Sequence, residues 1–334
     1  MSIRYKSVQF QSVLAPLINK FIQEKRACGY KYDTAPRLLK HFDHLICENK
    51  LKQIELPKEL ILQWITKQPH EQVATHHGRV CLIRQFTQFV AKLGYTSYIP
   101  PEHFGMARSY KFLPYIFTHE EIQKIIHAVD NIQSNAYSPI RHLIMPEIFR
   151  LLYGCGFRLS EVLNLRVRDV DFLRGVIIIH EGKFGKDRLV PPAWDVIDRL
   201  QVYTKQIEQN ILEKRTDNSF FFPSSRKQHA AWHNSAIYIL FRKLLYQCDI
   251  SHGGRGKGPR VHDLRHTFAV HRLIRWYEEG ADLNAKMPFL VAYLGHKDFT
   301  GTQKYLHLTA ELFPNLRDRM NKKFGSVIPT RRSS

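Results

Sequence analysis

The chain has little that would tie it to a membrane, a secretory route or a disulfide framework. It has five cysteines, an odd number, and no two of them form a C-x-x-C pair: Cys28, Cys47, Cys81, Cys155 and Cys248. This pattern excludes a disulfide scaffold and a zinc knuckle, so we expect buried free thiols in a reducing cytoplasm. Every apolar run falls short of the ~18 residues that a membrane helix needs, which predicts no membrane-spanning segment and no membrane partner.

Targeting and repetitive sequences are also missing. The apolar residues of the N-terminus are interrupted by Lys6, Gln9 and Gln11, which excludes a signal peptide. Neither a low-complexity segment nor an internal repeat is present. These absences favour ordinary folded domains in the cytoplasm.

Negative charge is scarce. Fifty lysines and arginines face 30 acidic residues, which gives a net charge of +20 and an isoelectric point near 9.8. Residues 1–105 hold 15 basic and 8 acidic residues (net +7) and the rest hold 35 and 22 (net +13), so the excess is not a tail. Two basic halves suit a clamp around a polyanion, such as double-stranded DNA, rather than a small-molecule substrate. Charge alone leaves RNA, ribosomes and acidic lipid open as partners.

The hydrophobic pattern divides the 334-residue chain into two domains. Four apolar stripes of helical period lie within residues 13–22, 38–46, 60–65 and 80–90, and Gly94 closes the last. Lys31, Arg79 and Arg84 lie between or opposite the stripes and would form a basic face on this bundle, although a merely solvated face explains any single lysine as well. The proline-rich stretch that follows predicts an interdomain linker.

The second domain has a mixed pattern. Thr118 with Glu121 predicts a capping box, and Ser160 is the expected N-cap of a short helix after the glycine turn at residues 154–157. The clearest strand is Val176–His180, and Arg188–Val190 is its return strand in a hairpin. Helical periodicity resumes at residue 193. The fold class is therefore mainly α with a small antiparallel β-sheet (α+β).

Chemistry-bearing residues come in a suggestive order in this second domain. The run His262-Asp263-Leu264-Arg265-His266 precedes Leu294-Gly295-His296, Tyr305 follows nine positions later, and Arg158 comes after the glycine turn. A tyrosine hydroxyl attacks a phosphodiester only with a proton acceptor and a cationic cradle, and the planar fork of arginine suits that cradle. His262 and Arg265 are three apart, so they share one face if they open a helix, where the N-terminus attracts phosphate.

Each of these residues has a structural interpretation when it is taken alone. Arg158 could be a surface arginine, Lys183 a solvated hairpin lysine, and Tyr305 a packing residue. The Leu294–His296 segment is typical of a helix end closed by glycine. Zinc binding is disfavoured because no H-E-x-x-H motif or cysteine partner accompanies the histidines. The ordered set as a whole predicts a DNA strand-transfer enzyme that needs no metal.

Five segments together resemble the tyrosine recombinases, the phage integrase family. The segment Gly156–Val162 is similar to the family's first-arginine motif, and Glu181-Gly182-Lys183 with Lys186 and Arg188 is similar to its lysine-bearing hairpin. The segments His262–Ala269, Leu294–His296 and Thr302–Tyr305 resemble its H-x-x-R, final histidine and nucleophile boxes. The resemblance is close over about residues 118–310, and no catalytic position is missing.

The resemblance implies a role for each of six residues. Tyr305 would attack the scissile phosphate and form a 3′-phosphotyrosine, which frees a 5′-hydroxyl. Arg158 and Arg265 would hold the non-bridging oxygens, and Lys183 would protonate the leaving oxygen. His262 would act as general base, and His296 would support the phosphate or the tyrosine. His266 and Glu161 would be neighbours that orient this set.

The resemblance also implies the domain organisation and the partners. Residues 8–97 would form an N-terminal helical DNA-binding (core-binding) domain, residues 98–115 a linker, and residues 116–325 the catalytic domain. The reaction would use no cofactor and no metal, because the covalent link conserves the phosphodiester energy. Four protomers would synapse two DNA sites in the bacterial cytoplasm or nucleoid, with Leu312–Leu316 and the basic stretch to Lys323 docking onto a neighbour.

Two other functions remain open at this point, a type IB topoisomerase and a DNA-binding protein without catalysis. The N-terminal bundle favours a site-specific clamp over the former, and the intact nucleophile and arginines argue against the latter. The sequence departs from the family at Met287-Pro288, which leaves the helix boundaries there open, and in a longer, more basic Gly253–Gly258 loop. The run Lys25–Tyr30 resembles integrases carried on mobile elements.

Overall fold

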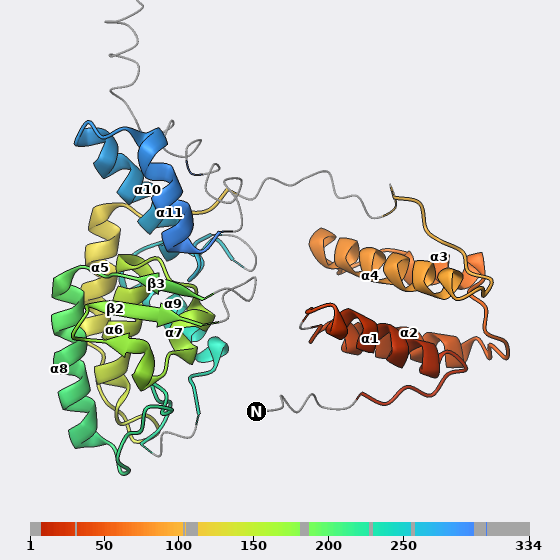
Figure 1. The fold of residues 1–334 in the computed structure, drawn as a ribbon, viewed down its shortest axis with the longest axis horizontal. Helices are drawn as coiled ribbons and strands as arrows, with labels where there is room; N and C mark the ends of the chain where they lie inside the picture. Colours follow the sequence, from red (N-terminus) through yellow and green to blue (C-terminus); the bar gives the residue numbers. More distant parts are fainter. Residues whose placement is uncertain are drawn as a thin grey trace, which may run out of the picture. The chain divides into compact units, whose positions relative to one another are not determined.

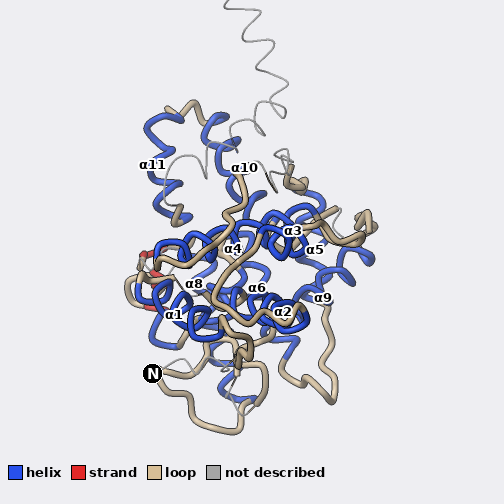
Figure 2. Tube along the Cα trace, turned by 90° about the vertical axis from the view of Figure 1, so that its right-hand side faces the viewer, coloured by secondary structure: helices blue, strands red, loops and turns tan. Residues whose placement is uncertain are grey.

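The computed structural model describes residues 8–30, 32–102, 104, 113–180, 187–226, 230–254, 258–296 and 305. The chain divides into two compact units, Met1–Phe112 and Leu113–Ser334. In the described residues of both units helices make up nearly all of the regular structure, and the strands belong to one small sheet (Figure 2). The predicted fold class, mainly α with a small antiparallel sheet, is confirmed. No helix in the described parts of the chain has the length and apolar character needed to cross a membrane.

In its described residues the first unit is a bundle of four helices, as the apolar stripes predict. The helices are α1 (Ala15–Ala27), α2 (Ala35–Glu48), α3 (Lys58–Ile65) and α4 (Val73–Lys92). Pro16 is tolerated because it lies in the first turn of α1, where its missing N–H has no helical partner. Gly94 follows the end of α4 with φ of 87°, the left-handed conformation expected of a glycine that closes a helix.

Two of the basic residues expected on an exposed face of this bundle serve the fold instead. Arg79 is buried, and its guanidinium forms an ion pair with Glu71 (2.7 Å) and hydrogen bonds to the carbonyls of Trp64 and Thr66. The guanidinium of Arg84 donates to the carbonyls of residues 100, 101, 102 and 104, which fastens the chain after α4 to the helix. The prediction of a basic face was therefore wrong for Arg79, which is buried, whereas the half-buried Arg84 is held by backbone carbonyls of the segment after α4, which need donors. Lys31 lies outside the described residues.

The second unit contains seven α-helices and a three-stranded sheet among its described residues (Figure 1). The helices are α5 (His119–Asp130), α6 (Arg141–Gly154), α7 (Leu159–Asn164), α8 (Trp194–Asn210), α9 (Asn234–Gln247), α10 (Asp263–Glu278) and α11 (Leu283–Leu294), with a 3-10 turn, η1 (Val167–Asp169). Helix α6 is the centre of the unit because it packs against α5, α7, α8 and α10. The capping box of Thr118 and Glu121 opens α5 as predicted.

The sheet has the strand order β1-β2-β3 and is antiparallel throughout. Strands β2 (Val176–Ile179) and β3 (Arg188–Val190) form the predicted hairpin and lie side by side in Figure 1. The two-residue strand β1 (Val170–Asp171) has no sequence prediction, because it is too short for a periodic signal. The prediction that Ser160 caps α7 was wrong, since Arg158 holds the N-cap position and the side chain of Glu161 accepts its N–H (2.8 Å).

The burial of the five cysteines differs from the sequence prediction. Only Cys155 and Cys248 are buried, whereas Cys28 and Cys47 are exposed and Cys81 is half-buried, so the expectation of buried thiols was wrong for three of the five free cysteines.

The helix whose boundaries the sequence left open around Met287-Pro288 is α11, and Pro288 lies inside it. Helices α10 and α11 pack together through Phe268, Leu273, Leu290 and Leu294, and this cluster also contains Tyr305.

Candidate active site

A glycine turn after α6 starts the site. Gly156 has φ of 61°, and a Cβ atom there would lie 2.5 Å from the Phe268 ring, so the turn requires glycine. The turn aims the Gly156 carbonyl at Arg265 and leads directly to Arg158, the N-cap residue of α7. The predicted turn thus places two arginines near each other although they are far apart in the sequence.

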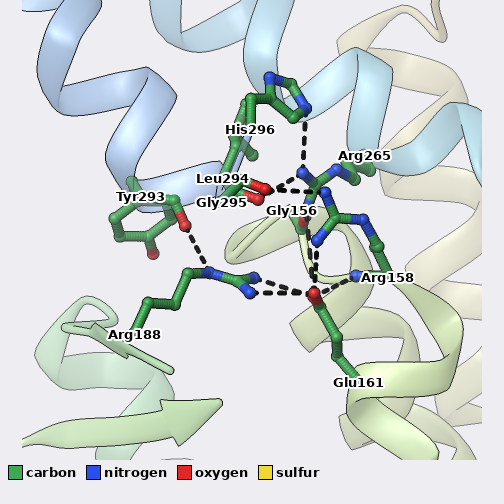
Figure 3. A network of polar contacts seen from close by, with 9 residues as sticks. All are labelled: Gly156, Arg158, Glu161, Arg188, Arg265, Tyr293, Leu294, Gly295 and His296. Atoms are coloured by element: carbon green, nitrogen blue, oxygen red, sulfur yellow. Dashed lines mark hydrogen bonds and ion pairs between the residues drawn. The ribbon is translucent and has the colours of Figure 1, made fainter. Parts of the chain in front are cut away.

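Glu161 lies in the first turn of α7 and binds two arginines (Figure 3). Its carboxylate accepts from Arg158 (2.6 Å) and takes a bidentate pair of hydrogen bonds from Arg188 of β3, both 2.9 Å. Burial raises the pKa of Glu161, but the hydrogen bonds and charges of Arg188 and Arg158 outweigh it and bring the pKa to about 2. Glu161 is therefore ionised at neutral pH and fixes both guanidinium groups.

Arg265 is the deepest cation of the site, with only 1% of its surface exposed. Its guanidinium donates to the carbonyls of Gly156 (2.7 Å) and Leu294 (2.5 Å) and lies 3.1 Å from Nε2 of His296. Burial and the neighbouring charge of Arg158 lower the pKa of Arg265 to about 9. The guanidinium therefore keeps its charge at neutral pH, and carbonyl oxygens hold its orientation.

The end of α11 supplies the opposite side of this network. Gly295 ends the helix in the left-handed conformation, and its carbonyl accepts from Arg158 (3.1 Å). Arg188 donates to the carbonyl of Tyr293 (3.0 Å), and a Cβ atom on Gly295 would lie 3.0 Å from the Arg188 side chain. Figure 3 shows the three guanidinium groups converging between α7 and the end of α11. The predicted glycine-closed helix end is present, and it is also a binding surface for arginine.

Tyr305 is fully buried among the side chains of α10 and α11. Its hydroxyl lies 2.7 Å from Nδ1 of His266, and its ring lies near that of His296, with 6.3 Å between centroids. Burial raises the pKa of Tyr305 to about 12, although the charges of Arg265 and Arg158 act in the opposite direction. The phenol is therefore protonated at neutral pH and has a nitrogen base at hydrogen-bond distance.

His262 occupies the N-cap position of α10, as its spacing from Arg265 predicts. The two residues have different surroundings, because His262 is exposed and Arg265 is buried. The ring of His262 packs edge-on against that of His266, with 4.8 Å between centroids and an interplanar angle of 88°. His262 is thus linked to the tyrosine through His266.

Several predicted features cannot be placed. Lys183 and Lys186 lie outside the described residues, and so do the segment from Leu312 to Lys323 and most of the loop between Gly253 and Gly258. Across the described ranges, no group of three or more potential metal-ligating side chains is found. The described part of the site contains Arg158, Arg265, His296 and Tyr305, with His262 beside them.

The charge balance of this network suits an anion. Three guanidinium groups, those of Arg158, Arg188 and Arg265, surround the single carboxylate of Glu161, which leaves a formal charge of +2 (3 − 1). Fixed cations next to a buried hydroxyl can stabilise the dianionic transition state of phosphoryl transfer to that hydroxyl. The arrangement is therefore suited to attack by a tyrosine on a phosphodiester.

Comparison with known proteins agrees with this geometry. The model of the phage integrase family matches residues 116–311, more than half of the chain. The chain belongs to the phage integrase family. Family membership makes it a tyrosine-type site-specific DNA recombinase, the function that the sequence predicted.

Individual relatives match over most of the chain. The y4rB protein of Sinorhizobium fredii is 29% identical, and the match covers 94% of this chain and 98% of that protein. Tyrosine recombinase XerC of Oceanobacillus iheyensis is 30% identical over 70% of each chain. The fold is similar to that of the XerH site-specific recombinase bound to its difH substrate, with a TM-score of 0.62 at 20% identity over 91% of this chain and 83% of that one.

Two contacts in the site were missed by sequence reasoning. The sequence marks Arg188 only as part of the hairpin motif, although it binds Glu161 and the end of α11. It marks His266 only as a neighbour of the catalytic set, although His266 contacts the Tyr305 hydroxyl. The four-residue spacing of His262 and His266 indicates that their side chains lie on one helix face, but no local signal indicates that Tyr305 comes to the same place.

Proposed function

We propose that this recombinase cleaves and rejoins double-stranded DNA through Tyr305, with a 3′-phosphotyrosine intermediate. The observation that carries the proposal is the buried Tyr305 hydroxyl on His266, beside guanidinium groups whose orientation is fixed by backbone carbonyls. Such a site has a nucleophile, a base and preorganised positive charge, which are what phosphoryl transfer to a tyrosine needs.

The roles of the arginines follow from their contacts. Arg158 and Arg265 bind the two non-bridging oxygens, while Glu161 and Arg188 hold Arg158 in place. His296, whose Nε2 accepts from Arg265, supports the phosphate or the tyrosine by hydrogen bonding. Lys183 is the acid that protonates the leaving 5′-oxygen, and His262 supports the proton transfer from the tyrosine through His266.

We further propose that the helical unit at the N-terminus binds DNA as a core-binding domain over residues 8–97. Its arginines Arg79 and Arg84 are committed to the fold, so exposed lysines supply the phosphate contacts: Lys20, Lys40, Lys50, Lys52, Lys58, Lys67 and Lys92. In this proposal residues 98–115 link the domains, the catalytic domain extends to residue 325, and four protomers assemble on two DNA sites. The run Lys25–Tyr30 supports an origin in a mobile element.

Covalent trapping tests the proposal. A duplex that the wild-type protein cleaves is selected from the DNA that flanks its coding sequence, nicked near the cleavage point, and incubated with protein in EDTA. Wild type should form an adduct that survives denaturing electrophoresis, whereas Tyr305→Phe should form none and bind the duplex nearly as well, because the ring still packs. Tyr153→Phe, another tyrosine whose hydroxyl contacts a histidine, should form the adduct normally.

Other outcomes would contradict separate parts of the proposal. An adduct from Tyr305→Phe would remove this residue as the nucleophile. Loss of wild-type cleavage in EDTA with recovery in Mg²⁺ or Zn²⁺ would show that a metal takes part. Exchange between two sites, rather than relaxation of supercoils alone, distinguishes recombination from topoisomerase activity.

A further inference from the structure

The tyrosine and the histidine that binds it are both withdrawn from solvent. Tyr305 is fully buried and His266 is 4% exposed, and the 2.7 Å contact joins the phenol oxygen directly to Nδ1 of the imidazole. The neutral imidazole that accepts this hydrogen bond carries its own hydrogen on Nε2. A protonated phenol thus lies against a base from which water is largely excluded.

Resting on the proposed function, we propose that His266 is a catalytic residue, the direct acceptor of the Tyr305 proton during DNA cleavage. As the phenol oxygen forms its bond to phosphorus, the O–H proton moves to Nδ1 and His266 becomes an imidazolium. The bond from phosphorus to the 5′-oxygen breaks, and that oxygen takes a proton from the separate acid. In rejoining, the 5′-hydroxyl attacks, the phenol oxygen leaves, and His266 returns the proton.

The position of His266 on α10 suits an acceptor. It is the fourth residue of the helix and is buried, so its Nδ1 meets the phenol oxygen directly. The charged groups that act on the phenol are Arg265, Arg158 and Asp263, and the arginines favour the phenolate. The proton therefore has a neutral base to move to, and the negative charge left on oxygen faces fixed cations.

His262 then has an indirect role. Its ring meets that of His266 edge-on, and it is exposed whereas His266 is buried. It stabilises the imidazolium of His266 and connects it with solvent between turnovers. The general base is therefore His266 and not His262, the first histidine of the H-x-x-R-H run. The two histidines are four residues apart, about one turn along the same helix.

The decisive variant is His266→Asn. An asparagine oxygen reaches the position of Nδ1 and can still accept the hydrogen bond, but an amide does not take up the proton. Single-turnover adduct formation on the nicked duplex should slow by roughly 10²- to 10⁴-fold, the contribution of a general base. Its rate should also rise about tenfold per pH unit, because hydroxide must then ionise the phenol. His271→Asn, the same change farther along α10, should keep the wild-type rate and profile.

A more acidic nucleophile provides a second measurement. Fluorinated tyrosine incorporated at position 305 ionises more readily, so it should restore much of the rate that His266→Asn loses. Near-wild-type cleavage by His266→Asn would overturn the proposal. A slower rate with an unchanged pH profile and no gain from fluorotyrosine would also overturn it, because that result indicates a structural role.

One arm does not depend on the folding of the asparagine variant. With fluorotyrosine at position 305 and His266 retained, the acidic limb of the pH–rate profile should stay at the same pH, because this limb reports protonation of the proton acceptor and not of the phenol. An acidic limb that shifts in pH with the acidity of the phenol would contradict the assignment of His266. Failure of the proposed function itself is distinguished by Tyr305→Phe, which would then form an adduct whatever residue occupies position 266.

Discussion

The two units use buried arginine in opposite ways. In the helical bundle, Arg79 forms an ion pair with Glu71 and also donates hydrogen bonds to two backbone carbonyls. One cation faces one carboxylate, so this pair has no net charge. In the second unit, three arginines share Glu161, and the positive excess lies beside Tyr305. Both clusters hold guanidinium groups rigidly. The clusters differ in the ratio of cations to carboxylates. A one-to-one pair stabilises the fold, whereas a cluster with excess positive charge can also bind phosphate.

The two clusters also differ in what their carboxylates experience. Hydrogen bonding to Arg79 lowers the pKa of Glu71 despite burial. Burial opposes ionisation of Glu161 as well, yet its contacts with Arg188 and Arg158 bring its pKa to about 2. A carboxylate shared among several arginines is thus held ionised over a wide pH range, which keeps the catalytic cluster assembled. Four changes test this contrast, from the largest expected effect to the smallest.

The first change concerns Lys183, which lies in the sequence between β2 and β3. Lys183→Ala should slow cleavage by roughly 10²- to 10⁴-fold, because it removes the acid for the leaving oxygen. A lysine in a hairpin is expected to be solvated, so the unfolding free energy should change by no more than about 0.5 kcal/mol. Single-turnover cleavage and denaturant unfolding measure the two effects.

A substrate with a bridging 5′-sulfur provides the control for Lys183, because a thiolate leaves without a proton. Lys183→Ala should be rescued on this substrate, and Arg158→Ala should not. Equal defects of Lys183→Ala on the oxygen and sulfur substrates would make Lys183 a DNA contact, with Lys186 as the next candidate for the acid.

Arg79→Ala should destabilise the bundle by about 3–5 kcal/mol, because Glu71 is left ionised and buried without its partner. Denaturant unfolding followed by circular dichroism measures the loss. Arg37→Ala, on the exposed face of α2, is the matched control and should change stability little. A loss below about 1 kcal/mol for Arg79→Ala would indicate that the pair contributes no more than a surface ion pair.

Arg265→Lys keeps the charge and removes the fork that donates to Gly156 and Leu294. We expect cleavage to fall by roughly 10²- to 10³-fold, as for the loss of one preorganised donor in a transition state. Arg79→Lys is the matched change in the bundle, and its cleavage rate per folded molecule should equal that of wild type. Similar rates for Arg265→Lys and Arg79→Lys would erase the proposed difference between the clusters.

Glu161→Gln tests the shared carboxylate through pH. The pKa of Glu161 falls from 4.5 to about 2, so its ionised form stabilises the fold above pH 4.5, and this contribution is lost as the pH falls toward 2. Wild type should exceed Glu161→Gln in unfolding free energy by about 3 kcal/mol at neutral pH, and the gap should narrow below pH 4.5. Glu59→Gln, exposed on α3, is the control. A gap that is independent of pH would contradict the ionised cluster.

Local sequence patterns determined most of the secondary structure. Periodic apolar residues gave the helices of both units, and the alternation of Val176–Ile179 with the return strand gave the hairpin. Motifs also marked the residues of the site, because Arg158, Arg265, His296 and Tyr305 lie in recognisable local contexts. A glycine that must adopt positive φ, such as Gly156 or Gly295, is a local requirement that sequence expresses directly.

Beyond local pairs such as the capping box of Thr118 and Glu121, tertiary structure decided which partners the polar side chains found. Nothing in the local sequence distinguishes Arg79 and Arg84 from surface arginines, and only the folded bundle shows that backbone carbonyls accept their hydrogen bonds. Arg188 reaches Glu161 from 27 positions away, and His266 reaches Tyr305 from 39. Such pairings depend on how helices pack against one another, and no local periodicity encodes that packing.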